Sequence, residues 1–556
     1  EWMLVPLRST EAILYRQRGV AEFVDNPFLR GDVRETLLDV LDIERLVAKV
    51  STGRANARDL LGLASSIAVV RPLLAKLENV YSKILGDLCE GLDPIEDQVD
   101  HVLQTLVDSP PMTIKEGGLI RDGMVEELDE LRQIAGDGKA WMARFQAEEI
   151  ERTGMAGLKV GFNSVFGYYL EVPRGQIDRV PETYIRKQTL KNAERYITPE
   201  LKEFEEKVLR AEERSKDLEC KLFLEMRESM AREVPRVLAT AQSIAVIDVL
   251  AALAQVAAEN RYTAPLIDNG ERIKIIDGRH PVIEHSLSDE TFVPNDTHLN
   301  RGNKMVGLIT GPNMSGKSTY IRQTALIVLL AQMGSYVPAG EAAIGVVDRI
   351  FTRIGSADDL SRGASTFMVE MVEIANILNN ATAKSLVVLD EVGRGTSTFD
   401  GVALAWAIVE HIHNVSRART LFATHYHQLT DLSETLEGVH NLSVAVREWE
   451  DEIIFLHRIV EGGTDRSYGI QVARLAGVPA ALIERAKIVL GELEGTLGYA
   501  AGKNSPEAKV MVSGEMQLGL FGPEPSVLDE AVKDLDPENM TPMEALAKVR
   551  ELKDLI

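Results

Sequence analysis

The sequence has 556 residues, of which 45% are hydrophobic and 26% charged, a composition typical of globular proteins. A chain this long exceeds a single hydrophobic core, so we expect two to four domains. Acidic residues outnumber basic ones by 85 to 61, and the net charge of −24 argues against a surface uniformly suited to nucleic acid, although local basic patches remain possible. The two cysteines, Cys89 and Cys220, exclude a disulfide framework and favour a reducing compartment such as the cytoplasm.

Helices are predicted for most of the chain before its α/β part. Apolar residues recur at helical spacing over Leu37–Val47. A long charged helix is expected over Pro199–Arg232, followed by an Ala-rich helix over about 234–259 that is apolar on nearly every face and therefore predicted to be buried. Because Asp248 and Gln255 interrupt its apolar stretch, we expect a buried helix rather than a membrane span.

Other parts of the sequence show patterns typical of strands, of an α/β domain and of a linker. Residues 157–173 combine apolar residues with glycines and predict a hairpin of strands. From about 266 to 460, apolar runs such as Met305–Ile309 and Leu386–Leu389 alternate with amphipathic helices, which indicates an α/β domain with a parallel or mixed sheet. After Glu494 the chain becomes rich in Gly, Ser, Pro and Glu, the composition of a linker.

A phosphate-binding loop is the sharpest local pattern. Residues 311–318 match G-x-x-x-x-G-K-[ST] between an apolar run and a helical stretch. Glycines let backbone N–H groups turn toward phosphate oxygens, and the helix N-terminus adds positive potential. Lys317 is expected to pair with the β- and γ-phosphates and Ser318 to ligate Mg²⁺. The predicted nucleotide-binding residues here are Gly311, Pro312, Asn313, Met314, Ser315, Gly316, Lys317, Ser318 and Thr319.

Two carboxylates complete the pattern. Asp390 and Glu391 follow the apolar run Leu386–Leu389, at the sheet edge where phosphates bind. Two acids after a strand could also begin a solvated turn. With a phosphate loop upstream, Asp390 is expected to hold Mg²⁺ and Glu391 to orient the attacking water. The sequence therefore predicts a nucleotide hydrolase with ATP or ADP and Mg²⁺ as ligands.

Several longer motifs resemble the MutS family of DNA mismatch-repair ATPases. They are the segments 363–371 and 390–401, Asn313-Met314, Thr424-His425, Gly278–Pro281, Gln188–Tyr196 and Ser467–Gly469. The resemblance covers nearly the whole chain and implies a multidomain α and α/β fold. Its expected parts are a helical core or lever domain (1–154 and 206–265), an inserted small β clamp domain (155–205), an ABC-type P-loop ATPase domain (266–460), a helix-turn-helix dimerisation element (461–495), a flexible linker (496–526) and C-terminal helices (527–556).

The resemblance also implies composite ATP sites built by two chains. Ser365 would reach the γ-phosphate held by the partner, although it could equally cap a helix, and both roles can hold at once. His425 would stand near the attacking water, so the expected catalytic residues are Glu391, His425 and Lys317. Phe292, Val293 and Asn295 would contact adenine and His457 would stack on it; from the residues alone, Phe292 fits a core equally well.

A local basic segment lies beside the β insertion. Between Tyr184 and Tyr196 four cations face one acid, Glu194, and neutral donors such as Tyr184 and Gln188 suit phosphates rather than base edges. By itself the segment could be a solvated basic face; by family likeness it contacts duplex DNA. The expected DNA contacts are Arg186, Lys187, Gln188, Lys191, Asn192 and Arg195. The segment 471–488 has a helix-turn-helix pattern, but the resemblance assigns it to bracing a partner ATPase domain rather than to reading DNA.

The linker contains an isolated apolar peptide. Apolar residues in a polar stretch cannot join a core and suggest a docking motif. Gln517, Leu518, Leu520 and Phe521 resemble the peptide with which bacterial repair proteins bind the replication sliding clamp.

The functional expectation is therefore an ATP-dependent, DNA-stimulated ATPase of mismatch repair that holds duplex DNA as a homodimer or tetramer. No mismatch-recognition or connector domain precedes Glu1, so the chain as given is not expected to discriminate mismatches. The resemblance adds a MutL-type partner and a cytoplasmic, nucleoid-associated location without a membrane. The alternatives are a MutS-like junction or recombination ATPase, an ABC-type ATPase subunit of a transporter, and a non-catalytic scaffold.

Overall fold

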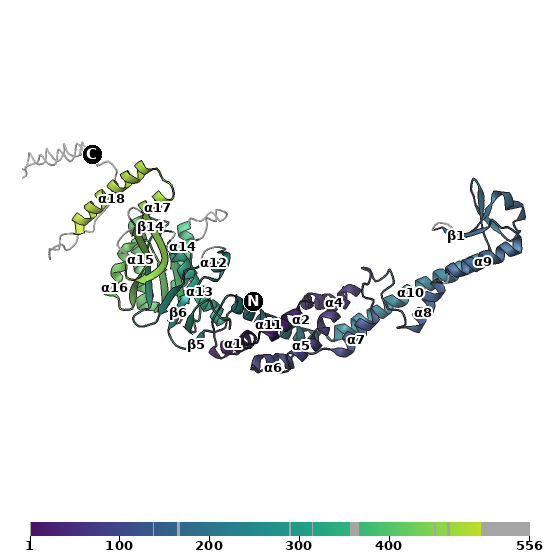
Figure 1. Ribbon diagram of the computed structural model, residues 1–556, viewed down its shortest axis with the longest axis horizontal. Helices are drawn as coiled ribbons and strands as arrows, with labels where there is room; N and C mark the ends of the chain where they lie inside the picture. The colour runs from purple at the N-terminus through teal and green to yellow at the C-terminus, as the bar shows by residue number, and fades with distance from the viewer. Residues whose placement is uncertain are drawn as a thin grey trace, which may run out of the picture. The chain divides into compact units, whose positions relative to one another are not determined.

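The computed structural model describes residues 2–136, 138–163, 167–287, 291–313, 315–355, 366–449, 452–463 and 468–501 (Figure 1). The chain divides after Gly477 into two compact units. Within the first unit a helical region, a small sheet and an α/β region follow one another along the chain. The described part of the second unit is one helix, α18 (Ala480–Ala501).

The helical region comes from two stretches of chain that share one hydrophobic core. Leu60 and Leu63 from the first stretch are buried together with Phe223 and Ile247 from the second. The chain therefore leaves this core, forms the small sheet and returns, as expected for an insertion. The helices are α1 (Thr10–Asp25), α2 (Pro27–Leu37), α3 (Ile43–Ser51), α4 (Ala57–Ala68), α5 (Val70–Lys76), α6 (Lys83–Glu90), α7 (Glu96–Thr105), α8 (Glu126–Gly136), α9 (Gly138–Thr153), α10 (Pro199–Arg232) and α11 (Val234–Glu259).

Capping residues divide these helices more finely than apolar spacing predicts. The apolar residues at helical spacing over Leu37–Val47 belong to two helices and their connection, because α2 ends at Leu37 and α3 begins at Ile43. Asp42 caps α3, since its carboxylate accepts a hydrogen bond from the Arg45 N–H at 2.9 Å. Leu38 and Leu41, in the connection, are exposed.

Helices α10 and α11 confirm the two long helices predicted over Pro199–Arg232 and 234–259. By length and composition α11 could cross a membrane, but half of its most apolar window is buried inside the molecule, the environment of a core helix. The prediction that nearly every face is buried is too strong, because Val256 is exposed.

The small sheet has four antiparallel strands in the order β1-β2-β4-β3. Its first pair confirms the hairpin predicted over 157–173, with Lys159 opposite Glu171. The second pair is formed by the basic segment, so the candidate DNA contacts lie on strands and their connecting turn. The elements are β1 (Lys159–Asn163), β2 (Gly167–Pro173), the 3-10 helix η1 (Arg174–Arg179), β3 (Ile185–Thr189) and β4 (Ala193–Ile197).

Helix α10 connects the small sheet to the helical core. At its start, Thr198 caps the helix by accepting the Leu201 N–H at 3.1 Å, and Leu201 is buried with small-sheet residues such as Tyr196. Near its end, Phe223 and Met230 are buried in the helical core. A helix of 34 residues spans about 50 Å, so one continuous element joins two separate cores.

The α/β region is built on a six-stranded sheet in the order β10-β11-β12-β8-β13-β14, parallel except for β13 against β14. Strands β8 and β11 confirm the runs predicted from Met305 and Leu386. The elements are β8 (Val306–Thr310), α13 (Lys317–Gln332), β10 (Ile350–Arg353), α14 (Thr366–Asn380), β11 (Leu386–Asp390), α15 (Thr398–His411), the π-helix η3 (Ile412–Ser416), β12 (Arg419–Ala423), the 3-10 helix η4 (His427–Asp431), α16 (Leu432–Thr435), β13 (Val439–Trp449) and β14 (Glu452–Glu461).

Helices cover both faces of this sheet. Successive residues of a strand point to opposite faces, and in β11 Val388 packs with Ile321 of α13, whereas Val387 packs with Ile374 of α14 and Ala405 of α15. Because both faces are covered, every residue of β8, β11 and β12 is buried, and none of these strands alternates between buried and exposed positions. Because these strands are parallel, their carboxyl ends meet at one edge of the sheet, and the loop that follows β8 leads from this edge into α13.

A second, four-stranded sheet has the order β5-β9-β6-β7. It shares a core with α13, since Ile275 and Ile344 are buried with Ile327 and Val328. Its elements are β5 (Leu266–Asp268), β6 (Ile273–Gly278), α12 (Pro281–Ser286), β7 (Asn295–Leu299) and β9 (Glu341–Gly345).

The first unit ends with α17 (Gly469–Leu475), which Gly477 terminates in the left-handed conformation with φ = 84°. The unit boundary falls inside the element predicted over 461–495, so its two helices belong to different units. Helix α18 continues over residues 496–501, which composition predicts as linker.

Candidate nucleotide site

The loop between β8 and α13 has the backbone that its glycines predict. Gly311 and Gly316 have φ values of 144° and 105°, a region that side chains other than hydrogen rarely enter. The loop is closed further by Ser315, whose hydroxyl donates to the Pro312 carbonyl at 2.7 Å. The chain can therefore turn sharply from the buried strand β8 into α13. The N-terminus of α13 lies at the end of this loop, where its N–H groups can bind an anion.

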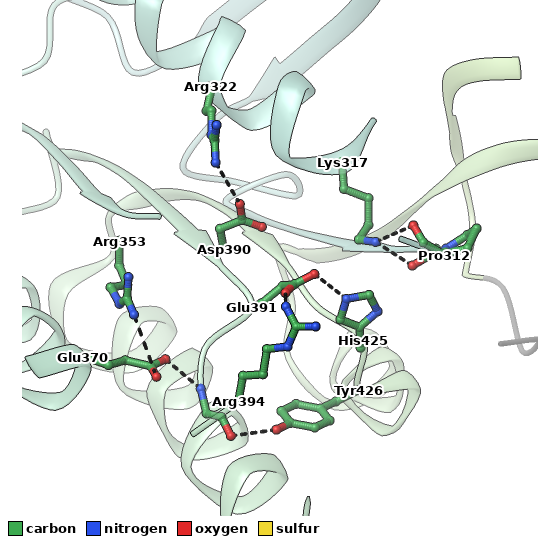
Figure 2. Close-up of polar contacts among 12 residues, drawn as sticks. Pro312, Lys317, Arg322, Arg353, Glu370, Asp390, Glu391, Arg394, His425 and Tyr426 are labelled. Atoms are coloured by element: carbon green, nitrogen blue, oxygen red, sulfur yellow. Dashed lines mark hydrogen bonds and ion pairs between the residues drawn. The ribbon is translucent and has the colours of Figure 1, made fainter. Parts of the chain in front are cut away.

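Lys317, the first residue of α13, is directed into this loop. Its ammonium donates to the carbonyl oxygens of Gly311 at 2.6 Å and Pro312 at 2.8 Å (Figure 2). The residue is only 4% exposed. Burial disfavours the charged form and lowers the pKa of Lys317 to about 8. Two neutral carbonyls thus hold the ammonium, and no carboxylate among the described residues bonds to it directly.

A cavity of about 350 Å³ opens beside the loop. Phe292 and Val293 line it on one side; both are at least partly exposed, so Phe292 is not a core residue. His457 also lines the cavity and donates from Nδ1 to the Ser315 carbonyl at 2.9 Å. Asn295 joins β7 to β14, because its amide donates to the His457 carbonyl at 2.9 Å and accepts the Ile459 N–H at 2.7 Å. The predicted adenine-contact residues therefore lie around one cavity with the phosphate loop.

The carboxylates enter from the end of β11. Glu391 follows the strand with φ = 53°, unusual for a residue with a side chain, and its N–H donates to the Ala423 carbonyl at 2.9 Å. One carboxylate oxygen is hydrogen-bonded to Nε2 of His425, and the other accepts from Arg394 at 2.6 Å (Figure 2). The hydrogen bond from His425, aided by the nearby cations, lowers the pKa of Glu391. Glu391 is therefore ionised at neutral pH.

Asp390 has a different environment. Burial raises its pKa, while the hydroxyl of Ser318 and the more distant Arg322, at 3.8 Å, oppose the increase. Its Oδ1 atom is buried and has no hydrogen-bond partner among the described residues. A buried carboxylate oxygen without a partner, beside a serine hydroxyl, fits the oxygen ligands that Mg²⁺ prefers. Ser318 and Asp390 are therefore suited to hold the ion.

The candidate DNA contacts of the small sheet divide into two groups. Arg186, Lys187, Lys191 and Asn192 are exposed on β3 and its turn, and Arg186 lies 3.5 Å from Glu194. The side chain of Arg195 is only 19% exposed. It bonds to Glu171 and to Gln188, both at 3.0 Å, and lies over the ring of Tyr169 at 4.2 Å.

The role predicted for Tyr184 is corrected by the structure. The sequence suggests this residue as a neutral hydrogen-bond donor to phosphate, but its ring is buried and its hydroxyl donates to Glu149 of α9. The prediction is wrong because Tyr184 lies just before β3 and packs with Phe145 and Tyr196 in the core of the small sheet.

Comparisons with protein families identify three segments. The profile of MutS domain V matches residues 307–494, that of MutS family domain IV matches 123–214, and that of the DNA mismatch repair protein MutS C-terminal region matches 522–555. Relatives match the whole length. The chain is 50% identical over 99% of its residues to the DNA mismatch repair protein MutS of Symbiobacterium thermophilum, and 49% identical over 98% to that of Acetivibrio thermocellus. The protein of the same name from Methanosarcina barkeri is 48% identical over the full chain.

The chain belongs to the MutS family. It spans 63 to 64% of the length of these three relatives. Domain V of the family thus contains the phosphate loop, Asp390, Glu391 and His425, and domain IV contains the whole small sheet together with α8, α9 and the first half of α10.

The MutS domain V site also contains residues that sequence reasoning missed. Arg394 and Arg322 pair with the two strand-end carboxylates, and with Arg353 and Glu370 they line a second cavity of about 420 Å³ that shares Ser318 and Glu391 with the first. Arg394 lies in a motif that the family resemblance already includes, so it could have been found. Glu370 likewise lies in such a motif, the segment 363–371, whereas Arg322 and Arg353 come from separate elements and have no local pattern.

Some predicted residues lie outside the part of the MutS chain that the structure describes. They are Met314, Ser365 and the sliding-clamp motif Gln517, Leu518, Leu520 and Phe521.

Proposed function

We propose that this MutS-family chain binds ATP with Mg²⁺ and hydrolyses it, with stimulation by duplex DNA, as part of mismatch repair. One observation carries the proposal: Lys317, Glu391 and His457 line one cavity, and a partnerless oxygen of Asp390 lies next to it. The basic loop suits a polyphosphate, and an ionised carboxylate beside it suits activation of water.

The proposed chemistry assigns a separate task to each group. Lys317 and the backbone N–H groups of its loop bind the β- and γ-phosphates, and the ammonium neutralises charge that develops in the transition state. Glu391 accepts a hydrogen bond from the attacking water and aligns it with the γ-phosphorus. His425 holds the carboxylate of Glu391 in place. Mg²⁺, held by Ser318 and Asp390, supplies positive charge to the phosphates.

The chain is proposed to act as a homodimer, with a tetramer as a further possibility. An apolar face of α14 supports this, since Met368, Val369 and Val372 are exposed, as is Phe399 at the start of α15. Exposed apolar residues gathered beside a nucleotide site are typical of an interaction surface. In such a dimer Ser365, directly before α14, would complete the partner's phosphate site.

DNA is proposed to bind at the small sheet, with the helical region acting as a lever between this clamp and the ATPase domain. The support is the exposed group of Arg186, Lys187, Lys191 and Asn192 in a chain whose net charge is −24. Gln188 adds a neutral contact and Arg195 a positioning role. Cations and amides of this kind bind phosphates without reading bases.

The remaining partners follow from the family. A MutL-type repair protein and the replication sliding clamp, the latter at Gln517–Phe521, are proposed partners, and the bacterial cytoplasm near the nucleoid is the proposed location. The reducing compartment is supported by two cysteines that are both free.

The deciding experiment is Glu391→Ala. We expect ATP affinity to remain within a few-fold, while the turnover rate falls by about 10²- to 10⁴-fold, because the group that orients water is lost. Glu434→Ala, an exposed acid on α16, is the matched control. Turnover should be measured with and without duplex DNA. Normal turnover by Glu391→Ala would reject its role, and absence of turnover by the unmodified chain would favour a scaffold. Turnover indifferent to DNA would favour a transporter-type ATPase.

A further inference from the structure

The loop that carries Glu391 is fastened at Gly393, two residues further on. Gly393 has φ = 87°, and a Cβ atom there would lie 2.9 Å from the Cα of Gly401, so only glycine fits. Its N–H donates to Oε1 of Glu370 at 2.8 Å, and its carbonyl accepts from the Tyr426 hydroxyl at 2.9 Å (Figure 2). Two side chains from separate parts of the chain therefore hold Gly393 on both sides and, through it, the left-handed backbone of Glu391.

Of the two hydrogen bonds to Gly393, the one to Glu370 is expected to be the stronger, because its acceptor is a buried carboxylate. Glu370 belongs to α14 and is only 4% exposed. Its second oxygen faces Arg353 at 3.9 Å, whereas Arg353 lies closer, at 3.2 Å, to Glu373 one turn further along α14. A hydrogen bond from a backbone N–H to a buried carboxylate is stronger than one between neutral groups, and its loss leaves the donor unpaired.

The position of Glu370 along α14 gives this contact a second consequence. Helix α14 begins at Thr366, directly after Ser365, which is proposed to reach the γ-phosphate bound by the partner subunit. Glu370 is four residues into this helix, about one turn from its start. The same side chain thus connects a helix that serves the partner's site to the loop that serves the site of its own subunit.

We propose that Glu370 is a positioning residue that couples the two composite ATP sites of the dimer. Its bond to Gly393 fixes Glu391 relative to α14, so a shift of α14 on engagement of the partner's nucleotide moves the loop that aligns the attacking water. This inference rests on the proposed function. Glu370 lines the second cavity rather than the first, so its proposed effect on the attacking water passes through Gly393 and Glu391.

Three variants separate this role from a general loss of structure. Glu370→Ala removes the acceptor, Glu370→Gln keeps an oxygen that accepts the Gly393 N–H, and Glu373→Ala removes the nearer partner of Arg353 while leaving Gly393 bonded. We expect Glu370→Ala to lower the single-turnover hydrolysis rate about tenfold. The affinity for a non-hydrolysable ATP analogue and the thermal unfolding midpoint should stay close to those of the unmodified chain. Glu370→Gln should recover most of the rate, and Glu373→Ala should retain it.

The outcomes are distinguishable. An unmodified chain without ATP turnover would overturn the proposed function together with this inference. Turnover that Glu370→Ala leaves unchanged would overturn the inference alone. An equal loss in Glu373→Ala would also overturn it, because Arg353 rather than Gly393 would then be the relevant contact.

Mixed dimers test the coupling itself. Each dimer has one hydrolysing subunit and one partner that cannot hydrolyse ATP: Glu391→Ala, which is expected still to bind ATP, or Lys317→Ala, which is not. Coupling predicts that the rate of the hydrolysing subunit differs at least about threefold between these two partners, and that Glu370→Ala in the hydrolysing subunit removes the difference. A difference that persists with Glu370→Ala, or no difference at all, would overturn the coupling and leave a local support of Glu391.

Discussion

The nucleotide site and the basic hairpin of the small sheet present cations in opposite ways. Lys317 is buried and bonded to two carbonyls of its own loop, whereas Lys187 and Lys191 are exposed on β3 and its turn. A buried cation is fixed in direction and has already lost its water, so an anion that reaches it gains most of the Coulomb energy. An exposed cation keeps its water and is screened by salt, so each one contributes little and several must act together.

The two regions should therefore differ in how strongly ligand affinity depends on the position of a single side chain. If the nucleotide site binds a polyphosphate as proposed, we expect its affinity to depend on the position of one ammonium, which two positive-φ glycines set. If the hairpin binds DNA as proposed, we expect its affinity to depend on the number of cations more than on the exact place of any one. Substitutions should therefore have large single effects in the first region and small additive effects in the second.

The largest expected effect is that of Lys317→Ala. It removes charge-assisted hydrogen bonds to two phosphates, worth about 1.5 to 3 kcal/mol each, so ATP affinity should fall by at least about 100-fold. Titration with a fluorescent ATP analogue measures this loss. Lys384→Ala, an exposed lysine before β11, should bind normally. Unchanged ATP affinity in Lys317→Ala would show that residues 311–318 do not bind the phosphates. The difference proposed between this site and the basic hairpin would then be rejected as well.

A smaller effect is expected from pH. Because burial lowers the pKa of Lys317 to about 8, the empty site loses its ammonium charge above that pH and must take up a proton when ATP binds. ATP affinity should accordingly fall as pH rises, by about tenfold between pH 7 and 9. Exposed lysines, with a pKa near 10.4, would show no such fall.

Calorimetric titration in two buffers of different ionisation enthalpy measures the proton uptake directly. Lys317→Arg keeps its charge across this range, so whatever affinity it retains should be independent of pH. Equal affinity at pH 7 and 9 without proton uptake in the unmodified chain would mean that Lys317 is not held in the desolvated state.

The two regions also differ in how much of them the sequence could predict. The backbone of the phosphate loop, the strand before Asp390 and the helix after Lys317 are all set by residues within one short segment, so local patterns found them. Glu370 and Tyr426 reach Gly393 from other elements, and no local pattern in a single sequence records which side chain meets a distant N–H.

In the hairpin the same limit has a different form. Counting charges along 184–196 finds one acid, Glu194, but the neighbouring strand β2 contributes Glu171 to Arg195. Partners across a sheet are set by register, and the register of β2 with β4 is fixed only when both strands pack on a common core. Helical spacing over Leu37–Val47 likewise gives no helix boundary: the cap at Asp42 begins a new helix although the apolar pattern continues across it.

The smallest expected effects distinguish the two kinds of arginine and lysine within the hairpin. Lys187→Ala removes an exposed cation and should weaken duplex binding about fivefold, with the slope of log affinity against log salt reduced by about 0.9. Arg195→Ala should leave that slope nearly unchanged, because its guanidinium is already paired with Glu171 and lies over Tyr169. It should instead lower the free energy of unfolding by about 1 kcal/mol. Salt titrations of DNA binding and thermal melts of both variants decide the matter. Equal slopes for the two variants would show that Arg195 breaks its ion pair with Glu171 and binds a DNA phosphate instead. The DNA affinity of the hairpin would then depend on its total number of cations, whether or not they are paired within the sheet.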